Sequence, residues 1–123
     1  MRRSFPWFPA IFAAALLTDA AVALAAEAPQ GDAVKGKQHF LNDGCGFCHG
    51  TVGQGGGGRT GGLRLAQMGI GFAAFLNQLR HPVNEMPPYL AAALSDQDVA
   101  DIYAYVTGLP PAPDVKSIPI LNN

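Results

Sequence analysis

The sequence lacks any run of basic residues, any internal repeat and any pattern typical of β-strands. Without a basic run, it has no local electrostatic signature for binding nucleic acid. Without strand signals or repeats, its 123 residues leave room for one small all-α domain and no more. Cysteine is also scarce, because the chain contains only Cys45 and Cys48. The chemistry that these two residues support is therefore the first question.

The first 25 residues have the three parts of a secretory signal peptide in the expected order. Two arginines make a positive start, Ile11–Leu17 is a short apolar run, and Ala23–Ala25 fits the small-x-small pattern of a cleavage site. An uncleaved membrane anchor is the alternative, but Asp19 near the centre of such a helix would cost about 2.5–3.5 kcal/mol. No cysteine lies at the cleavage site, which argues against a lipid anchor. We expect cleavage near Ala25, a periplasmic location and no stable membrane insertion.

The rest of the chain divides into three expected parts. These are a linker at 26–30, a single domain at 31–110 and a proline-rich, extended tail at 111–123. Six basic and eight acidic residues remain after cleavage, which gives a formal charge of −2 before any cofactor binds. This balance again gives no reason to expect a nucleic-acid partner. The length suffices for one modest hydrophobic core.

Cys45 and Cys48 are followed directly by His49, and this residue decides among several uses of the pair. In an exported chain, C-x-x-C can form a redox or structural disulfide, half of a zinc site, or a haem attachment site. A zinc site needs four ligands, and a thioredoxin-like site needs a βαβ pattern; the sequence has neither. C-x-x-C-H is the signature of covalent haem attachment. The two thiols reach two vinyl groups on one porphyrin edge, and the imidazole of His49 is held under the iron as proximal ligand. We therefore expect one covalently bound haem c.

Helix signals lie on both sides of this motif. Asp32 is expected to cap a helix that ends near residue 42. An apolar stripe predicts a second helix over 71–80. Ser95 and Asp98 resemble a capping box, which predicts the start of a third helix.

The segment directly after the motif is a glycine-rich loop. Residues 50–62 contain eight glycines, a composition that no regular element tolerates. We expect this loop to pass close to the haem, with Arg59 as a candidate partner for a haem propionate. The alternative for Arg59 is a solvated position on a flexible loop. Residues 63–69 are expected to form one turn of helix.

Four residues are candidates for the second axial ligand: Met68, Met86, His39 and His81. Met86 is favoured because it begins a non-helical segment whose two prolines stiffen the backbone, so its thioether has little entropy to lose on binding iron. Met68 is more typical of an ordinary core or surface methionine. His39 is expected to be solvated and His81 to cap a helix end. An open or water-filled sixth position remains as an alternative.

Residues 31–110 resemble the class I cytochromes c, the small soluble monohaem type. The matching parts are Gly36 and Phe40, the motif Cys45–Gly50, Met86–Tyr89, Leu94–Asp96 and Ala104–Val106. The resemblance implies an all-α fold wrapped around one covalently bound haem c. It also implies that the first and last helices cross, with Gly36 and Phe40 meeting Tyr103.

One departure from that family follows the haem motif. The family usually has a Gly-Pro-x-Leu element, whose proline carbonyl accepts the Nδ1 proton of the proximal histidine. Here the corresponding stretch, Gly61–Leu65, has no proline. The carbonyl of Gly62 is the expected substitute, in a looser loop that holds the imidazole less firmly.

With His49 and Met86 both on the iron, the expected function is one-electron transfer, so the protein is a carrier and not an enzyme. A methionine ligand favours reduced iron and raises the reduction potential. The expected partners are redox proteins: a dehydrogenase, a terminal oxidase or another cytochrome. Three alternatives remain open. They are an electron-accepting subunit of a periplasmic dehydrogenase complex, a haem sensor or enzyme with an open sixth iron position, and a thiol–disulfide oxidoreductase.

Overall fold

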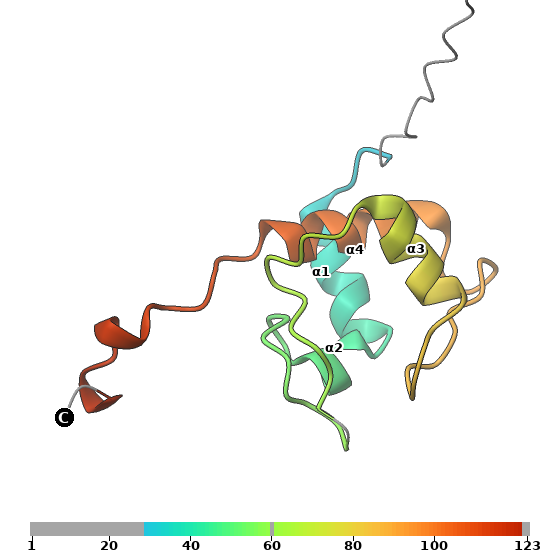
Figure 1. Ribbon diagram of the computed structural model, residues 1–123. Helices are drawn as coiled ribbons and strands as arrows, with labels where there is room; N and C mark the ends of the chain where they lie inside the picture. The colour runs from blue at the N-terminus through green and yellow to red at the C-terminus, as the bar shows by residue number, and fades with distance from the viewer. Residues whose placement is uncertain (1–28, 60, 122–123) are drawn as a thin grey trace, which may run out of the picture.

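The structure is a computed structural model that describes residues 29–59 and 61–121. It has four α-helices, α1 (Ala33–Asn42), α2 (Cys45–His49), α3 (Phe72–Arg80) and α4 (Asp96–Gly108), followed by the 3₁₀ helices η1 (Val115–Ser117) and η2 (Pro119–Leu121) (Figure 1). The described residues contain no strand, which confirms the expected all-α class. The predicted signal peptide lies outside these residues.

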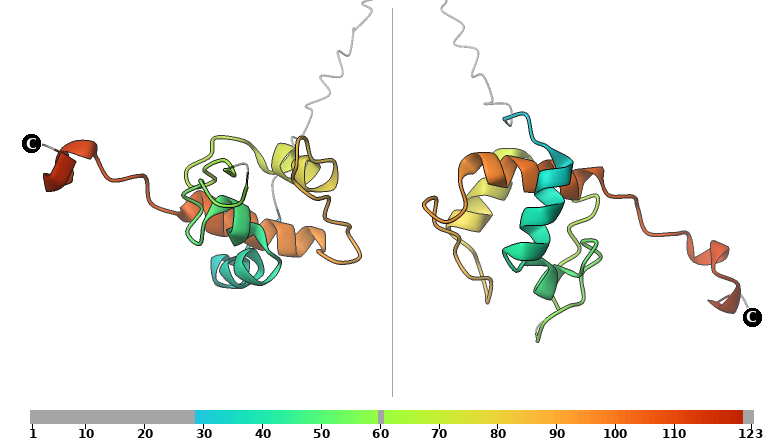
Figure 2. Two further views of the ribbon diagram at one scale, coloured as in Figure 1. Left: turned by 90° about the horizontal axis from the view of Figure 1, so that it is seen from below. Right: turned by 180° about the vertical axis from the view of Figure 1, so that it is seen from behind.

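Helix α1 begins where the sequence predicts it. The carboxylate of Asp32 accepts hydrogen bonds from the backbone N–H groups of Val34 and Lys35, at 2.8 and 3.2 Å. These bonds satisfy two of the donors that the start of a helix leaves without partners. The helix buries Gly36 and Phe40, and it packs across α4 (Figures 1 and 2).

Gly36 allows α1 and α4 to approach closely. A Cβ atom at this position would collide with the backbone carbonyl of Asp101 on α4, so a larger residue requires one of the helices to move. Further along α1, the ring of Phe40 packs edge-on against Tyr105, with ring centroids 5.4 Å apart. The crossing of the first and last helices is therefore confirmed, but the prediction that Tyr103 meets Phe40 is wrong.

Tyr103 faces another helix, because two positions along a helix differ by about 200° in direction. Its ring packs against Phe72 and Phe75 of α3, with centroids 5.6 and 5.4 Å apart. Its hydroxyl donates a hydrogen bond to the carbonyl of Ile70 at 2.9 Å. Tyr103 thus joins α4 to α3, whereas Tyr105 joins α4 to α1.

Helix α4 begins with the expected capping box. The Ser95 hydroxyl accepts a hydrogen bond from the Asp98 N–H at 3.2 Å, and the Asp98 carboxylate accepts one from the Ser95 N–H at 2.9 Å. The carboxylate also accepts a bond from the Ser95 hydroxyl, at 2.7 Å. This side-chain bond, followed by the backbone bond, lowers the pKa of Asp98 below its usual value.

A buried carboxylate ties the starts of α1 and α4 together. Asp101 is only 3% exposed. Its Oδ1 accepts hydrogen bonds from the Asp32 N–H at 2.8 Å and from the Gln97 side-chain amide at 2.9 Å. Such bonds offset the large cost of removing a carboxylate from water.

The hydrophobic core lies among α1, α3 and α4. Its buried members are Phe40, Phe75, Leu79, Leu94, Val99, Ile102, Tyr105 and Val106. Cys45 and Met86 pack against this cluster while remaining half-buried. The core therefore also supports the segments that carry Cys45 and Met86, which lie on either side of α3 in the sequence.

Residues 63–69 do not form the expected turn of helix. The backbone only turns at Ala66 and Gln67, and Gln67 has a left-handed φ of 64°, which a right-handed helix cannot contain. The side-chain amide of Gln67 donates to the carbonyl of Leu109 at 2.5 Å. This bond fixes the loop to the end of α4.

After α4 the chain leaves the helical body. Within the described residues, η1 and η2 pack on each other and on none of the α-helices, and Figures 1 and 2 show this segment extending away from them. The tail was expected to be extended throughout residues 111–123. It is extended only as far as Asp114, which caps η1, and the prediction is wrong for the segments that form η1 and η2.

Candidate functional site

The two thiols lie on one short helix. Gly44 has a φ of 90°, a left-handed backbone that glycine adopts without strain, and this residue leads the chain from α1 into α2. Cys45 and Cys48 are three residues apart on α2, a spacing that puts side chains on one face of a helix. Cys45 is half-buried against the core, and Cys48 is exposed. The helix therefore presents both thiols on one side, as attachment to one edge of a porphyrin requires.

His49 ends α2, and a backbone carbonyl orients its ring. Nδ1 of His49 lies 2.7 Å from the carbonyl oxygen of Leu63, so Nδ1 carries the proton and donates it. In the neutral ring, this tautomer leaves a free lone pair on Nε2, the form in which imidazole binds a metal. The prediction that Gly62 supplies this carbonyl is wrong. Leu63 supplies it, and Leu63 occupies the place of the missing proline.

The glycine-rich loop folds back against α2. The N–H of Gly55 donates to the His49 carbonyl at 2.7 Å, and the N–H of Gly57 donates to the Cys48 carbonyl at 3.0 Å. A Cβ atom at Gly62 would collide with the same Cys48 carbonyl. The loop can lie this close to the cysteine-bearing helix because it has no side chains at these points.

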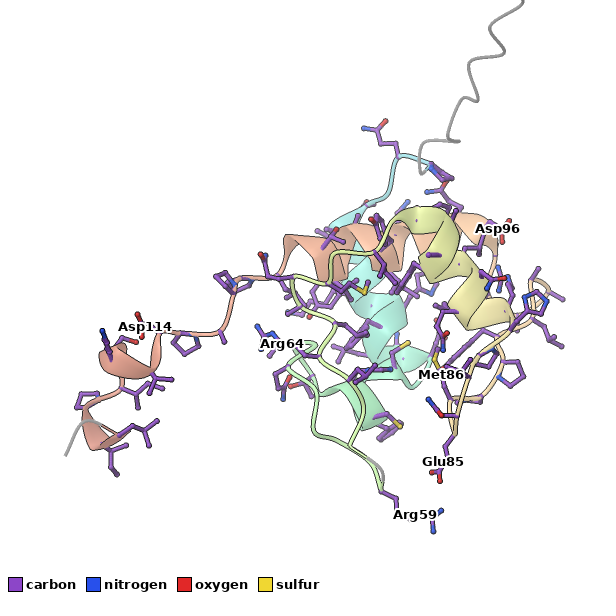
Figure 3. The ribbon with its side chains drawn as sticks, viewed as in Figure 1. Arg59, Arg64, Glu85, Met86, Asp96 and Asp114 are labelled. Carbon is purple, nitrogen blue, oxygen red and sulfur yellow. The ribbon has the colours of Figure 1, made fainter. Side chains whose placement is uncertain are left out.

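Met86 lies on the segment that connects α3 to α4. Its side chain is half-buried against the core, and in Figure 3 it extends inward from its segment, toward the side on which α2 lies. The N–H of Tyr89 donates to the carbonyl of Leu79 at 2.9 Å, which fixes the segment to the end of α3. Nε2 of Gln78 lies 3.8 Å from the Met86 sulfur.

Arg80 holds the same segment and belongs to no recognisable motif. Its guanidinium donates to the carbonyls of Tyr89 and Leu94 at 2.7 and 2.9 Å, and it pairs with Asp96 at 2.5 Å. Its side chain is only 15% exposed, although arginine is usually at the surface. The one signal in the sequence was a basic residue in the last turn of a predicted helix, where backbone carbonyls lack partners.

Tyr89 connects the Met86 segment to the start of the haem motif. Its hydroxyl donates to the carbonyl of Asp43 at 3.0 Å. Partial burial, followed by the charge of a neighbouring Cys45 thiolate, raises the pKa of Tyr89 to about 12, so the phenol remains a donor at neutral pH. Burial likewise raises the pKa of the Cys45 thiol.

Arg59 and Glu85 meet at the outer ends of two loops (Figure 3). Nη2 of Arg59 lies 3.4 Å from Oε1 of Glu85, and the side chains are 88% and 57% exposed. An exposed ion pair of this kind contributes about 0–1 kcal/mol. Because Glu85 directly precedes Met86, the pair joins the glycine-rich loop to the Met86 segment. The contact between Arg59 and a haem propionate stays a prediction.

The other candidates for the second axial position have different surroundings. Met68 is half-buried against the core. His39 is held between two carboxylates, with Nδ1 2.9 Å from Asp43 and Nε2 3.3 Å from Asp98, so carboxylates as well as water surround it. His81 is exposed, and its Nδ1 lies 3.2 Å from a side-chain amide one turn earlier on α3.

The residues present fit a covalently bound haem. The two free thiols share one face of α2, and the bond to Leu63 uses Nδ1 of His49, not Nε2. The thioether of Met86 lies half-buried against the core, on a separate segment of the chain. The bare glycine backbone keeps the loop closely packed on α2, where side chains would obstruct it. An all-α fold with this site defines a c-type cytochrome domain.

Comparison with known families agrees with this class. The chain belongs to the family described as Cytochrome C oxidase, cbb3-type, subunit III, which it matches over residues 31–106. The match includes α1 to α3 and most of α4. The domain therefore has a haem-based electron-transfer function, with haem c as cofactor and redox proteins as partners, and acts as a carrier rather than a catalyst. No curated protein matches the chain, and no helix within residues 29–59 and 61–121 is long and apolar enough to cross a membrane.

Proposed function

We propose that the protein is a periplasmic electron carrier that holds one haem c. Cys45 and Cys48 form the two thioether bonds, and His49 and Met86 are the axial ligands of the iron. When bound, haem c supplies an Fe(II)/Fe(III) couple that accepts and releases one electron. The observation that carries the proposal is the 2.7 Å bond from His49 Nδ1 to the Leu63 carbonyl, because it leaves Nε2 available to a metal.

Met86 is the best candidate for the second axial position because its segment is held at several points. Arg80 binds the backbone carbonyl of Tyr89, and the Tyr89 hydroxyl binds the backbone next to the haem motif. A thioether ligand favours reduced iron. With side chains in both axial positions, no position is open to a substrate, which suits a carrier.

The core beside the site is dry. Phe40, Phe75 and Leu94 are 0–4% exposed, so they exclude water and lower the local dielectric constant. A medium of this kind disfavours the additional charge of ferric iron. The core therefore acts in the same direction as Met86 and supports a raised reduction potential.

Export to the periplasm is the part of the proposal that rests on sequence alone. The leader at residues 1–25 supports it.

Cys48 is exposed, so one edge of the site lies at the surface, where a redox partner can approach. Low-area, short-lived contacts are usual for such partners. We also propose that Arg59 contacts a haem propionate.

Expression with the native leader, in a bacterium that attaches haem c, tests this proposal. We expect a haem-staining band on a denaturing gel that disappears in the Cys45→Ser/Cys48→Ser variant. We also expect Met86→Leu to lose the weak far-red ferric band of a methionine–iron bond, while the matched control Met68→Leu retains it. A wild-type protein without stain would refute the proposal. A stained but high-spin wild type would favour a sensor with an open sixth position.

A second function is favoured by two observations: the chain could serve as an electron-transfer subunit of a larger complex. The family description names an oxidase subunit. The segment after α4 also stands apart from the helical body and exposes Val115, Ile120 and Leu121 by 59–79%. The complex would contain a periplasmic dehydrogenase or a terminal oxidase. Co-purification of such a subunit with the tagged holoprotein supports this function, and a monomer with full redox activity contradicts it.

A further inference from the structure

Gln78 is a polar residue placed beside the buried side of α3. It follows Phe75 by three positions and directly precedes Leu79, and these two side chains are 4% and 3% exposed. Residues three positions apart lie on one face of a helix. Gln78 is accordingly half-buried. A side-chain amide in such surroundings is unfavourable unless it finds a hydrogen-bond acceptor.

The acceptor that Gln78 finds is the sulfur of Met86. Nε2 of Gln78 lies 3.8 Å from Sδ of Met86, which is eight positions further along the chain. Within the described part of the chain, the side-chain amide of Gln78 makes its hydrogen bond to this sulfur. A thioether sulfur is a weak acceptor. The contact therefore matters less for the stability of the fold than for what it does to the sulfur.

We propose that Gln78 is a positioning residue for the Met86 sulfur, and that its hydrogen bond raises the reduction potential of the centre. This inference rests on the proposed role of Met86 as an axial ligand. A thioether sulfur has two lone pairs, so one can face the iron while the other accepts the N–H of Gln78. The donor withdraws electron density from the sulfur. Ferric iron depends on that density more than ferrous iron does, so the bond favours the reduced state.

The same bond limits the motion of Met86. A methionine side chain has three rotatable bonds and adapts readily to its surroundings. The backbone contacts of Arg80 and Tyr89 fix the segment but leave these rotations free. Gln78 is the residue that contacts the sulfur itself. Its loss should therefore make Met86 easier to displace by an added ligand such as imidazole.

The test compares Gln78→Leu with the wild-type holoprotein. Leucine fills a similar volume but cannot donate a hydrogen bond. We expect the redox equilibrium to shift about three- to fivefold toward the ferric form, which is about 30–40 mV at 59 mV per tenfold for one electron. We also expect imidazole to displace Met86 at a several-fold lower concentration. Gln78→Asn, which is one methylene shorter and cannot reach the sulfur, should change both readouts in the same direction and serves if Gln78→Leu does not fold.

Asn77→Leu is the matched control, because Asn77 is the exposed neighbour on the same helix and bonds to the side chain of His81. Its potential and imidazole affinity should equal those of the wild type. A wild type with the methionine–iron band, together with Gln78 variants of unchanged potential, would overturn the inference and leave the proposed function intact. A wild type that lacks the band would refute the proposed ligand, and this inference with it.

Discussion

The carbonyl oxygen of Leu63 lies 2.7 Å from Nδ1 of His49, across 14 positions of the chain. The side chain of Leu63 is 80% exposed, so its contribution to the site comes from the backbone. This explains how the site keeps its geometry without the proline that class I cytochromes c usually have here. Any residue type can supply this carbonyl, provided that the loop between His49 and residue 63 places it beside the imidazole ring.

Gly62→Ala should disturb that delivery. The new Cβ atom would collide with the backbone carbonyl of Cys48, so the loop must move away from α2 and carry the Leu63 carbonyl with it. We expect the free energy of unfolding, measured by urea denaturation, to fall by about 1–3 kcal/mol. Gly69→Ala is the control, because a Cβ atom there meets open space. Equal stability of the two variants would contradict this account.

Gly36→Ala should loosen the packing of α1 on α4. The added methyl group would overlap the carbonyl of Asp101, and backbone atoms cannot rotate aside as a side chain can. Thermal or urea unfolding should show a loss of about 1–3 kcal/mol or more. Gly108→Ala, in α4, adds its methyl group to open space. That variant should be as stable as the wild type or gain up to about 1 kcal/mol from helix propensity, and a shared loss would argue against the crossing as the cause.

Arg80→Met should release the segment that carries Met86. The variant loses the bonds to the carbonyls of Tyr89 and Leu94 and the ion pair with Asp96. Because carbonyls bound to a charged donor then lose their partner, we expect a loss of about 2–4 kcal/mol of stability, together with displacement of Met86 by less imidazole. Arg80→Lys should rescue little, since an ammonium lacks the planar fork of donors. Arg64→Met, at an exposed residue with one 3.4 Å bond, should stay within about 0.5 kcal/mol of the wild type.

Asp98→Asn should weaken the start of α4 in a pH-dependent way. The Ser95 hydroxyl lowers the folded-state pKa of Asp98 below the ordinary value of 3.8. A lowered pKa stabilises the fold above pH 3.8, and this stabilisation disappears as the pH falls through the folded-state pKa. At pH 7 the variant should be about 0.5–1 kcal/mol less stable, as expected for a weakened cap. Stability curves that stay parallel into acid, rather than converge, would contradict the prediction.

Much of the helical framework could be predicted, because its signals are local. The Asp32 cap, the apolar stripe over 71–80 and the Ser95–Asp98 box each lie within the helix that they define. Helix α2 could not be predicted in the same way, since five residues carry too little periodicity. Residues 63–69 were expected to form a turn of helix, but Gln67 adopts a left-handed backbone conformation that no side-chain pattern in the sequence indicates.

The predictability of the site follows the same division. Cys45, Cys48 and His49 lie within five consecutive residues, so their motif is visible in the sequence. Leu63 acts through its backbone carbonyl, and Arg80 binds backbone carbonyls of other residues. Every residue type has such a carbonyl, so the side-chain pattern does not reveal these contacts. The resemblance to class I cytochromes c indicated correctly that α1 and α4 cross, but the register it implied, with Tyr103 against Phe40, is wrong. On α4, Tyr105 contacts Phe40 of α1, whereas Tyr103, two positions earlier, contacts α3.

The pairing of α1 with α4 has a consequence for how the protein matures. The bond from the Asp32 N–H to Asp101 spans 69 positions of the chain, so α1 cannot bury its apolar face until the last helix is present. Contacts between such distant residues are slow to form, because a long loop must first be closed. If the leader exports the chain N-terminus first, as proposed, Cys45 and Cys48 would emerge before α4 and be open to haem attachment. The pairing of α1 with α4 would then close the domain only after that interval.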